Sequence, residues 1–171
     1  MGGYLSIPVL ALAVVIQATV LPELRIAGGA PDLLFLLVLG YSLLQGFERG
    51  VVWAIVGGLL HDLVSAVPEG VTSLALVTTI GAVALIVGRN APRNLVIPPL
   101  LAAGATALYH VVVLVSLLLV GRPLPIPALL MYVTVPTAVY NLVLMVPVYH
   151  LLAGLSPSRR PRPLDDRQRR L

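Results

Sequence analysis

Long apolar runs alternate with short polar breaks along the whole chain. Proline, glycine and charged residues interrupt the apolar runs, several of which are long enough to cross a bilayer as helices. The predicted spans are residues 4–21, 31–46, 51–67, 71–87, 98–120 and 128–153. No soluble domain fits between them. The pattern therefore predicts an all-α polytopic membrane protein, a compact bundle of about six transmembrane helices.

Three details of this pattern predict local departures from regular spanning helices. The second span opens at Pro31-Asp32, where Asp32 is placed as an N-cap, and at 1.5 Å per residue it is roughly 22 Å long. That is shorter than the ~30 Å hydrocarbon core. Residues 48–50 (Glu-Arg-Gly) are predicted to form a tight break before the third span. Pro136 and Pro147 lie inside the last span and are expected to kink it.

Composition rules out a soluble globular domain. The 171 residues are 58% hydrophobic and only 11% charged, with a mean hydropathy of +1.01. A soluble core of this size could not bury so much apolar surface. The chain has no cysteine, which excludes disulfides and thiolate sites. We expect a transmembrane domain over residues 1–155 and an arginine-rich, disordered cytoplasmic tail over residues 156–171.

The arginines predict the orientation of the bundle. With both termini in the cytoplasm, the inner segments carry nine arginines and the outer segments carry two, Arg25 and Arg122. The tail holds six arginines against two aspartates and so accounts for the net charge of +4. Arg159, Arg160 and Arg162 are predicted to anchor the chain at anionic lipid, since a basic tail beside a membrane body favours lipid over nucleic acid.

Few ionisable residues lie within the predicted spans. Asp62 on the third span and His110 on the fifth fall within about one helical turn of the same depth, counted at 1.5 Å per residue. We therefore predict an Asp62–His110 pair that locks the bundle, and we favour this structural role over a catalytic or proton-relay role. No ligand spacing indicates a metal site, and no motif indicates a cofactor.

Small residues recur on one face of the third span. Gly50, Ala54 and Gly58 are spaced four residues apart, with Gly57 beside them. In lipid such smooth faces let helices approach closely. Two interpretations remain open at this point: the face packs within the bundle, or it receives a helix of a partner protein.

The segment 31–70 resembles the MreD family, the small membrane subunit of the bacterial cell-elongation machinery. The resemblance rests on a Pro-Asp opening, an Arg-Gly turn, a Gly-x-x-x-Asp pattern on the third span and a Pro-x-Gly turn. The positions that carry these motifs are Pro31, Asp32, Arg49, Gly50, Asp62, Pro68 and Gly70. Elsewhere only the length, the six spans and the basic tail agree with the family.

The resemblance implies a non-enzymatic scaffold of the bacterial inner membrane that supports lateral peptidoglycan synthesis and rod shape. The implied partners are MreC and, through it, the RodA glycosyltransferase, a class B penicillin-binding protein and the actin-like MreB. The bundle of this family is also similar to the substrate-binding subunits of energy-coupling-factor vitamin transporters. A small-solute binding subunit is therefore the alternative; it would need polar residues that converge on an outward cavity, and the few candidates are Asp62, His110, Asn141 and some threonines and tyrosines. A membrane hydrolase or transferase would need at least two converging acid/base groups near the surface, and Asp62 as the sole buried acid counts against it.

Overall fold

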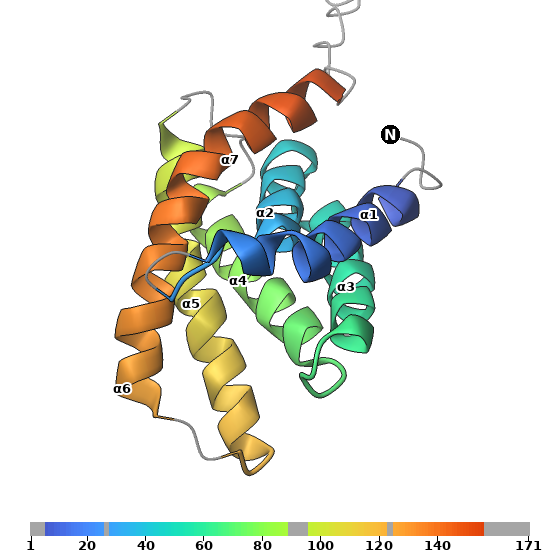
Figure 1. Cartoon of the computed structure of the whole chain (residues 1–171). Coiled ribbons are helices and arrows are strands. Elements are labelled where there is room, and N and C mark those ends of the chain that lie inside the picture. The colour runs from blue at the N-terminus through green and yellow to red at the C-terminus, as the bar shows by residue number, and fades with distance from the viewer. Residues whose placement is uncertain (1–5, 26–27, 89–95, 123–124, 156–171) are drawn as a thin grey trace, which may run out of the picture.

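The computed structural model describes residues 6–25, 28–88, 96–122 and 125–155, and all regular structure in them is helical. The order is α1 (Ser6–Thr19), the 3₁₀ turn η1 (Leu21–Leu24), α2 (Leu33–Gln45), α3 (Phe47–Val64), α4 (Val71–Val87), α5 (Ile97–Leu119), α6 (Ile126–Leu129), the π-helical segment η2 (Leu130–Thr134) and α7 (Val135–Leu155). The predicted all-α class is therefore confirmed. Figure 1 shows α1 crossing the bundle obliquely, while α5 and the α6–α7 segment form its longest walls.

Helix length divides the bundle into long and short members. Two helical segments in the described part of the chain are long and apolar enough to cross a membrane, Ile97–Leu119 and Pro127–Leu155. Helix α2 has only 13 residues, or roughly 20 Å at 1.5 Å per residue, so the second predicted span is short in the structure too. The number of six membrane crossings stays a prediction.

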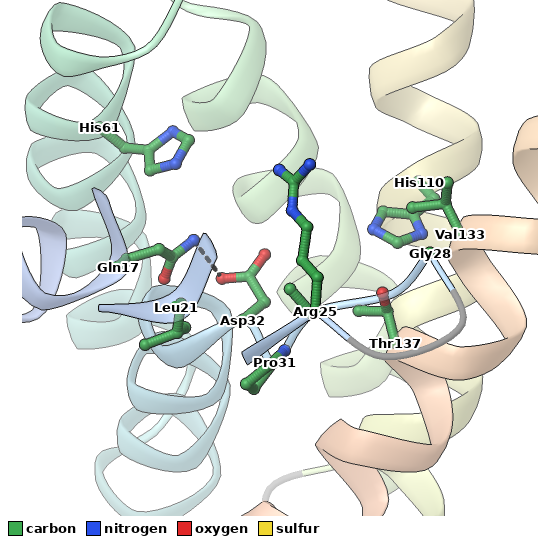
Figure 2. Close-up of a pocket in the computed structure, with 11 residues that line it drawn as sticks. Gln17, Leu21, Arg25, Gly28, Pro31, Asp32, His61, His110, Val133 and Thr137 are labelled. Atoms are coloured by element: carbon green, nitrogen blue, oxygen red, sulfur yellow. Dashed lines mark hydrogen bonds between the residues drawn. The ribbon is translucent and has the colours of Figure 1, made fainter. Parts of the chain in front are cut away.

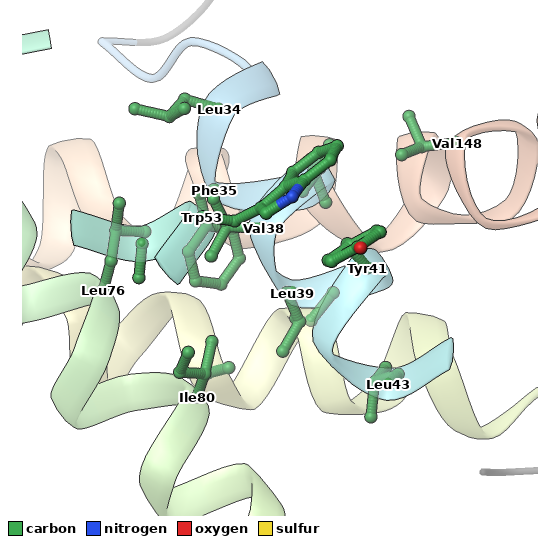
Figure 3. Packing of buried hydrophobic residues seen from close by; sticks show 14 of the residues in the cluster. Leu34, Phe35, Val38, Leu39, Tyr41, Leu43, Trp53, Leu76, Ile80 and Val148 are labelled. Carbon is green, nitrogen blue, oxygen red and sulfur yellow. The ribbon is translucent and has the colours of Figure 1, made fainter. Parts of the chain in front are cut away.

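Helix α2 is the centre of the core, as Figure 3 shows. It packs against α1, α3, α4, α5 and α7, and nine of its 13 residues are buried. Phe35, Val38 and Leu39 of α2 are at most 1% exposed, and the Tyr41 ring stacks on Trp53 of α3 at a centroid distance of 4.0 Å. Because protein rather than lipid surrounds α2, its length need not match the bilayer.

The predicted tight break at residues 48–50 is wrong. The chain turns at Gly46, whose φ of 94° suits glycine and whose N–H donates to the Ser42 carbonyl at the end of α2. Residues 48–50 lie in the first turns of α3. Glu48 is stabilised there because a negative side chain is favourable at a helix N-terminus. The Glu-Arg-Gly pattern predicts a break at residues 48–50, whereas the glycine with a positive φ is Gly46.

The last predicted span contains two proline-related features. The five-residue π-helical segment η2 ends just before α7, in which Pro136 is the second residue. Proline has no N–H to continue the preceding hydrogen-bond ladder, and π segments commonly absorb such interruptions. Pro147 lies inside α7, and Figure 1 shows that helix bending along its length.

Candidate binding pocket

The small-residue face of α3 lies inside the bundle. A Cβ atom added at Gly50 would lie 2.5 Å from the Ser42 side chain of α2, and one at Gly58 would lie 2.5 Å from the Ser73 backbone of α4. Gly57 faces α1 and α2 in the same way, and Ala54 is 0% exposed. Of the two interpretations left open by the sequence, the geometry supports internal packing. A partner must therefore contact another part of the surface.

Asp62 fixes the beginning of α4. Its Oδ2 accepts a hydrogen bond from the Gly70 N–H at 2.8 Å, and both carboxylate oxygens lie 3.3 Å from the Thr72 nitrogen. The N-cap position of α4 is Gly70, which has no side chain to satisfy the free N–H groups of the first turn. Asp62, only 3% exposed, supplies that cap from the end of the neighbouring helix.

The predicted Asp62–His110 pair is not formed. The His110 Nδ1 atom lies 2.9 Å from the Thr134 hydroxyl of η2, and Asp62 has the α4 backbone as its partner. Helix α3 packs against α1, α2 and α4, whereas α5 packs against α2, α4 and α7. Counting residues along two helices gave similar depths, but it carried no information about the helices between them.

A polar network joins four helices around Asp32. The predicted N-cap is confirmed, because Asp32 Oδ1 accepts the Phe35 N–H at 3.0 Å at the start of α2. The same oxygen accepts the Gln17 side-chain N–H of α1 at 2.9 Å. The Gln17 carbonyl oxygen in turn accepts the Leu34 N–H at 2.8 Å. The first turn of α2 therefore depends on side chains for its free donors.

Asn141 extends this network to α7 and α5. It is 0% exposed; its carbonyl oxygen accepts the Asp32 backbone N–H at 3.0 Å, and its amide donates to the Thr106 hydroxyl at 2.9 Å. The Thr106 hydroxyl donates to the Ala102 carbonyl at 2.7 Å. Each member has a partner, as buried polar groups in an apolar bundle require.

The segment before α2 packs against η2 and α7 through its backbone. A Cβ atom at Gly29 would lie 2.6 Å from the Pro136 side chain and 2.7 Å from the Thr137 nitrogen. One at Gly28, where φ is 87°, would lie 2.6 Å from the Tyr132 carbonyl oxygen. Only glycine allows this approach. Non-helical backbone among membrane helices is tolerated where protein buries it or where it lines a water-filled cavity.

A cavity lies beside this segment. It has a volume of about 370 Å³ and is shown in Figure 2. Its lining residues come from α1, η1, the segment between η1 and α2, α3, α5, η2 and α7: Gln17, Leu21, Arg25, Gly28, Ala30, Pro31, Asp32, His61, His110, Val133 and Thr137. The pocket lies where α1 ends and α2 begins, the side that the arginine distribution predicts to be outer.

Several polar atoms in the pocket have no partner in the described structure. The Arg25 side chain is exposed and extends between His61 and His110 in Figure 2. It forms no hydrogen bond or ion pair with another described residue. His61 and His110 each contact a threonine hydroxyl through Nδ1, at 3.4 and 2.9 Å, which leaves their Nε2 atoms available. No cluster of three metal-ligating side chains occurs among the described residues.

The sequence identified only part of this pocket. The sequence predicts Asp32 as a helix cap and His110 as a polar lock, but not as pocket residues. Arg25 was used only to predict the orientation of the bundle, and Gln17 and Thr137 were not identified. The available signal was the position of Arg25, an isolated cation just before a glycine-rich segment.

The remaining predicted positions have separate structural roles. Pro31 lines the pocket, and the Pro68 carbonyl accepts the Val71 N–H in the turn held by Asp62. Arg49 is exposed and donates to the Gln45 side chain. Arg159, Arg160 and Arg162 lie outside the described residues.

Comparison with known proteins identifies the family. Residues 2–156 match the family described as rod shape-determining protein MreD. The chain therefore belongs to this family of membrane proteins, which act in the determination of rod shape. No curated protein and no solved structure matches the chain, so the expected similarity to energy-coupling-factor subunits stays a prediction.

Proposed function

We propose that this member of the MreD family is a non-enzymatic scaffold of the bacterial elongation complex, which docks MreC and thereby supports lateral peptidoglycan synthesis by RodA and a class B penicillin-binding protein. MreB would join the assembly through MreC. The family match supports the role in rod shape. The bundle would span the inner membrane several times with both termini in the cytoplasm and with the 156–171 tail against anionic lipid.

The pocket is the observation that carries the docking proposal. The small-residue face of α3 is used within the bundle, and exposed side chains such as Leu85, Leu119 and Met131 are suited to contact with lipid. Apolar contact with lipid is not selective, whereas a concave polar site can recognise one partner. A single-span partner such as MreC brings the residues beside its span to this depth on the outer side. We therefore place MreC docking at the pocket.

A small-solute binding subunit is the second candidate, because it too needs an outward polar cavity. A volume of about 370 Å³ lies within the range typical of small-molecule sites. The two functions differ in the expected occupant. A scaffold pocket holds a protein segment, whereas a transport subunit retains a small molecule and takes it up when it is combined with an energising module.

The test is co-expression of the chain with the MreC and RodA candidates of its own genome, followed by purification in mild detergent through a C-terminal tag. Val133→Trp would fill the pocket from η2, and Met131→Trp places the same side chain on the exposed side of η2, where Met131 is 71% exposed. We expect recovery of MreC with the wild type and Met131→Trp but not with Val133→Trp. Absence of elongation proteins together with a co-purified small molecule would reject the scaffold in favour of the transport subunit.

A further inference from the structure

We propose that Arg25 is the residue of the pocket that determines specificity, and that it pairs with an acidic side chain on the docking segment of the partner. This inference rests on the proposed function and adds the chemistry by which the pocket recognises its occupant. The acidic residue belongs to a protein segment on the outer side of the membrane.

The first argument is the isolation of the Arg25 charge. The guanidinium carries five N–H donors in a planar fork, and none of them has a hydrogen-bond partner in the described structure. Water can satisfy an exposed guanidinium. A docked segment would displace that water, and a cation that loses water needs an anionic partner. A carboxylate matches the fork with two parallel hydrogen bonds.

The second argument is that Asp32, the acidic residue of the same pocket, hydrogen-bonds to groups other than Arg25. Its Oδ1 atom accepts hydrogen bonds from Gln17 and from the Phe35 N–H, which hold it at the start of α2. No ion pair joins it to Arg25. Asp32 Oδ2 accepts no hydrogen bond from a described residue and Arg25 does not pair with it, so the guanidinium stays available to an acid on the partner.

The third argument is the balance of donors and acceptors around the pocket. Arg25 adds five N–H donors, and each pocket histidine has a free ring nitrogen beside its threonine contact. The side-chain oxygens of the lining without a described partner are Asp32 Oδ2 and the Thr137 hydroxyl, and the free histidine nitrogens donate or accept according to the tautomer. A carboxylate supplies two acceptor oxygens and no donor when ionised, and therefore complements the N–H donors of Arg25. The volume of about 370 Å³ leaves room for the residues beside the acid.

The experiment measures binding of purified MreC to Arg25→Gln and to Arg122→Gln, at low and at high salt. Arg122 is the matched control, since it is the other predicted outer arginine, is exposed and does not line the pocket. We expect Arg25→Gln to weaken binding by about tenfold or more and to lose most of the salt dependence. Arg122→Gln should bind like the wild type. Unchanged melting temperatures would show that both variants fold.

A charge exchange identifies the acid on the partner. Each acidic residue beside the membrane span of MreC is changed to lysine and tested against Arg25→Glu, and we expect one combination to restore binding. Equal MreC binding by Arg25→Gln and the wild type would overturn the inference and leave the scaffold standing. No MreC binding by the wild type would instead reject the scaffold. Native mass spectrometry that finds a phospholipid on the wild type but not on Arg25→Gln, with MreC binding equal, would also overturn it by assigning Arg25 to a lipid phosphate.

Discussion

Replacement of Asp62 by leucine tests whether a side chain from α3 holds the beginning of α4. The leucine occupies a similar space but accepts no hydrogen bond. In the variant the Gly70 and Thr72 N–H groups lose their carboxylate acceptor, and Gly70 has no side chain to replace it. Because Asp62 is 3% exposed, water has little access to compensate.

The expected cost follows from those two contacts. A hydrogen bond to a charged group contributes about 1.5–3 kcal/mol, and loss of an N-cap costs about 0.5–2 kcal/mol. The two estimates describe the same atoms and are not summed, so Asp62→Leu should lower the free energy of unfolding by about 1.5–3 kcal/mol. Asp62→Asn keeps one acceptor oxygen and should cost about 1 kcal/mol. For a chain of this length each kcal/mol corresponds to roughly 2–4 °C in melting temperature.

Thermal unfolding in one detergent measures the wild type, both Asp62 variants and Leu63→Ala. Leu63 is 70% exposed, so its variant controls for a substitution on the outer surface of the same helix turn. We expect the order of stability wild type, Leu63→Ala, Asp62→Asn, Asp62→Leu. Equal melting temperatures for Asp62→Leu and the wild type would refute the reasoning, because the cap would then contribute nothing to the bundle.

Two further predictions concern the network and the topology. Asn141→Leu removes an acceptor from the Asp32 N–H and a donor from Thr106, so it should cost about 1–3 kcal/mol in the same unfolding assay, and stability like the wild type would contradict the network. The chain lacks cysteine, so Glu69→Cys and Glu48→Cys each introduce a unique exposed thiol. An impermeant maleimide should label the first in intact spheroplasts and the second only after permeabilisation; the reverse pattern would invert the proposed orientation.

Apolar patterning was sufficient to predict the helical class and most helix positions. The predicted span 71–87 coincides with α4, and Asp32 caps α2 as its place before an apolar run indicated. These features are local, since residues within a few positions determine them. The prediction of a break at residues 48–50 was wrong because a charged residue is compatible with the start of a helix. The chain turns instead at Gly46, whose backbone conformation ends α2.

The sequence did not allow us to predict which helices lie side by side. Depth counting matched Asp62 with His110, yet the structure assigns them to the α4 backbone and to Thr134. Likewise, the spacing of Gly50 and Gly58 predicted a close helix contact but could not identify the neighbour. The spacing of residues along one helix specifies which of them share a face. Only the three-dimensional fold specifies which neighbouring helix packs against that face.

The pocket itself is a consequence of the short central helix. Helix α2 is roughly 15 Å shorter than α5 at 1.5 Å per residue, and the chain that enters α2 packs through Gly28 against η2 and through Gly29 against α7. The Asp32 carboxylate that begins α2 also lines the pocket, so under the proposed function MreC docking there is coupled to the stability of the bundle. Substitution of Asp32 would therefore disturb fold and docking together. Arg25 lines the same pocket without a described structural contact, so its substitution isolates recognition from folding.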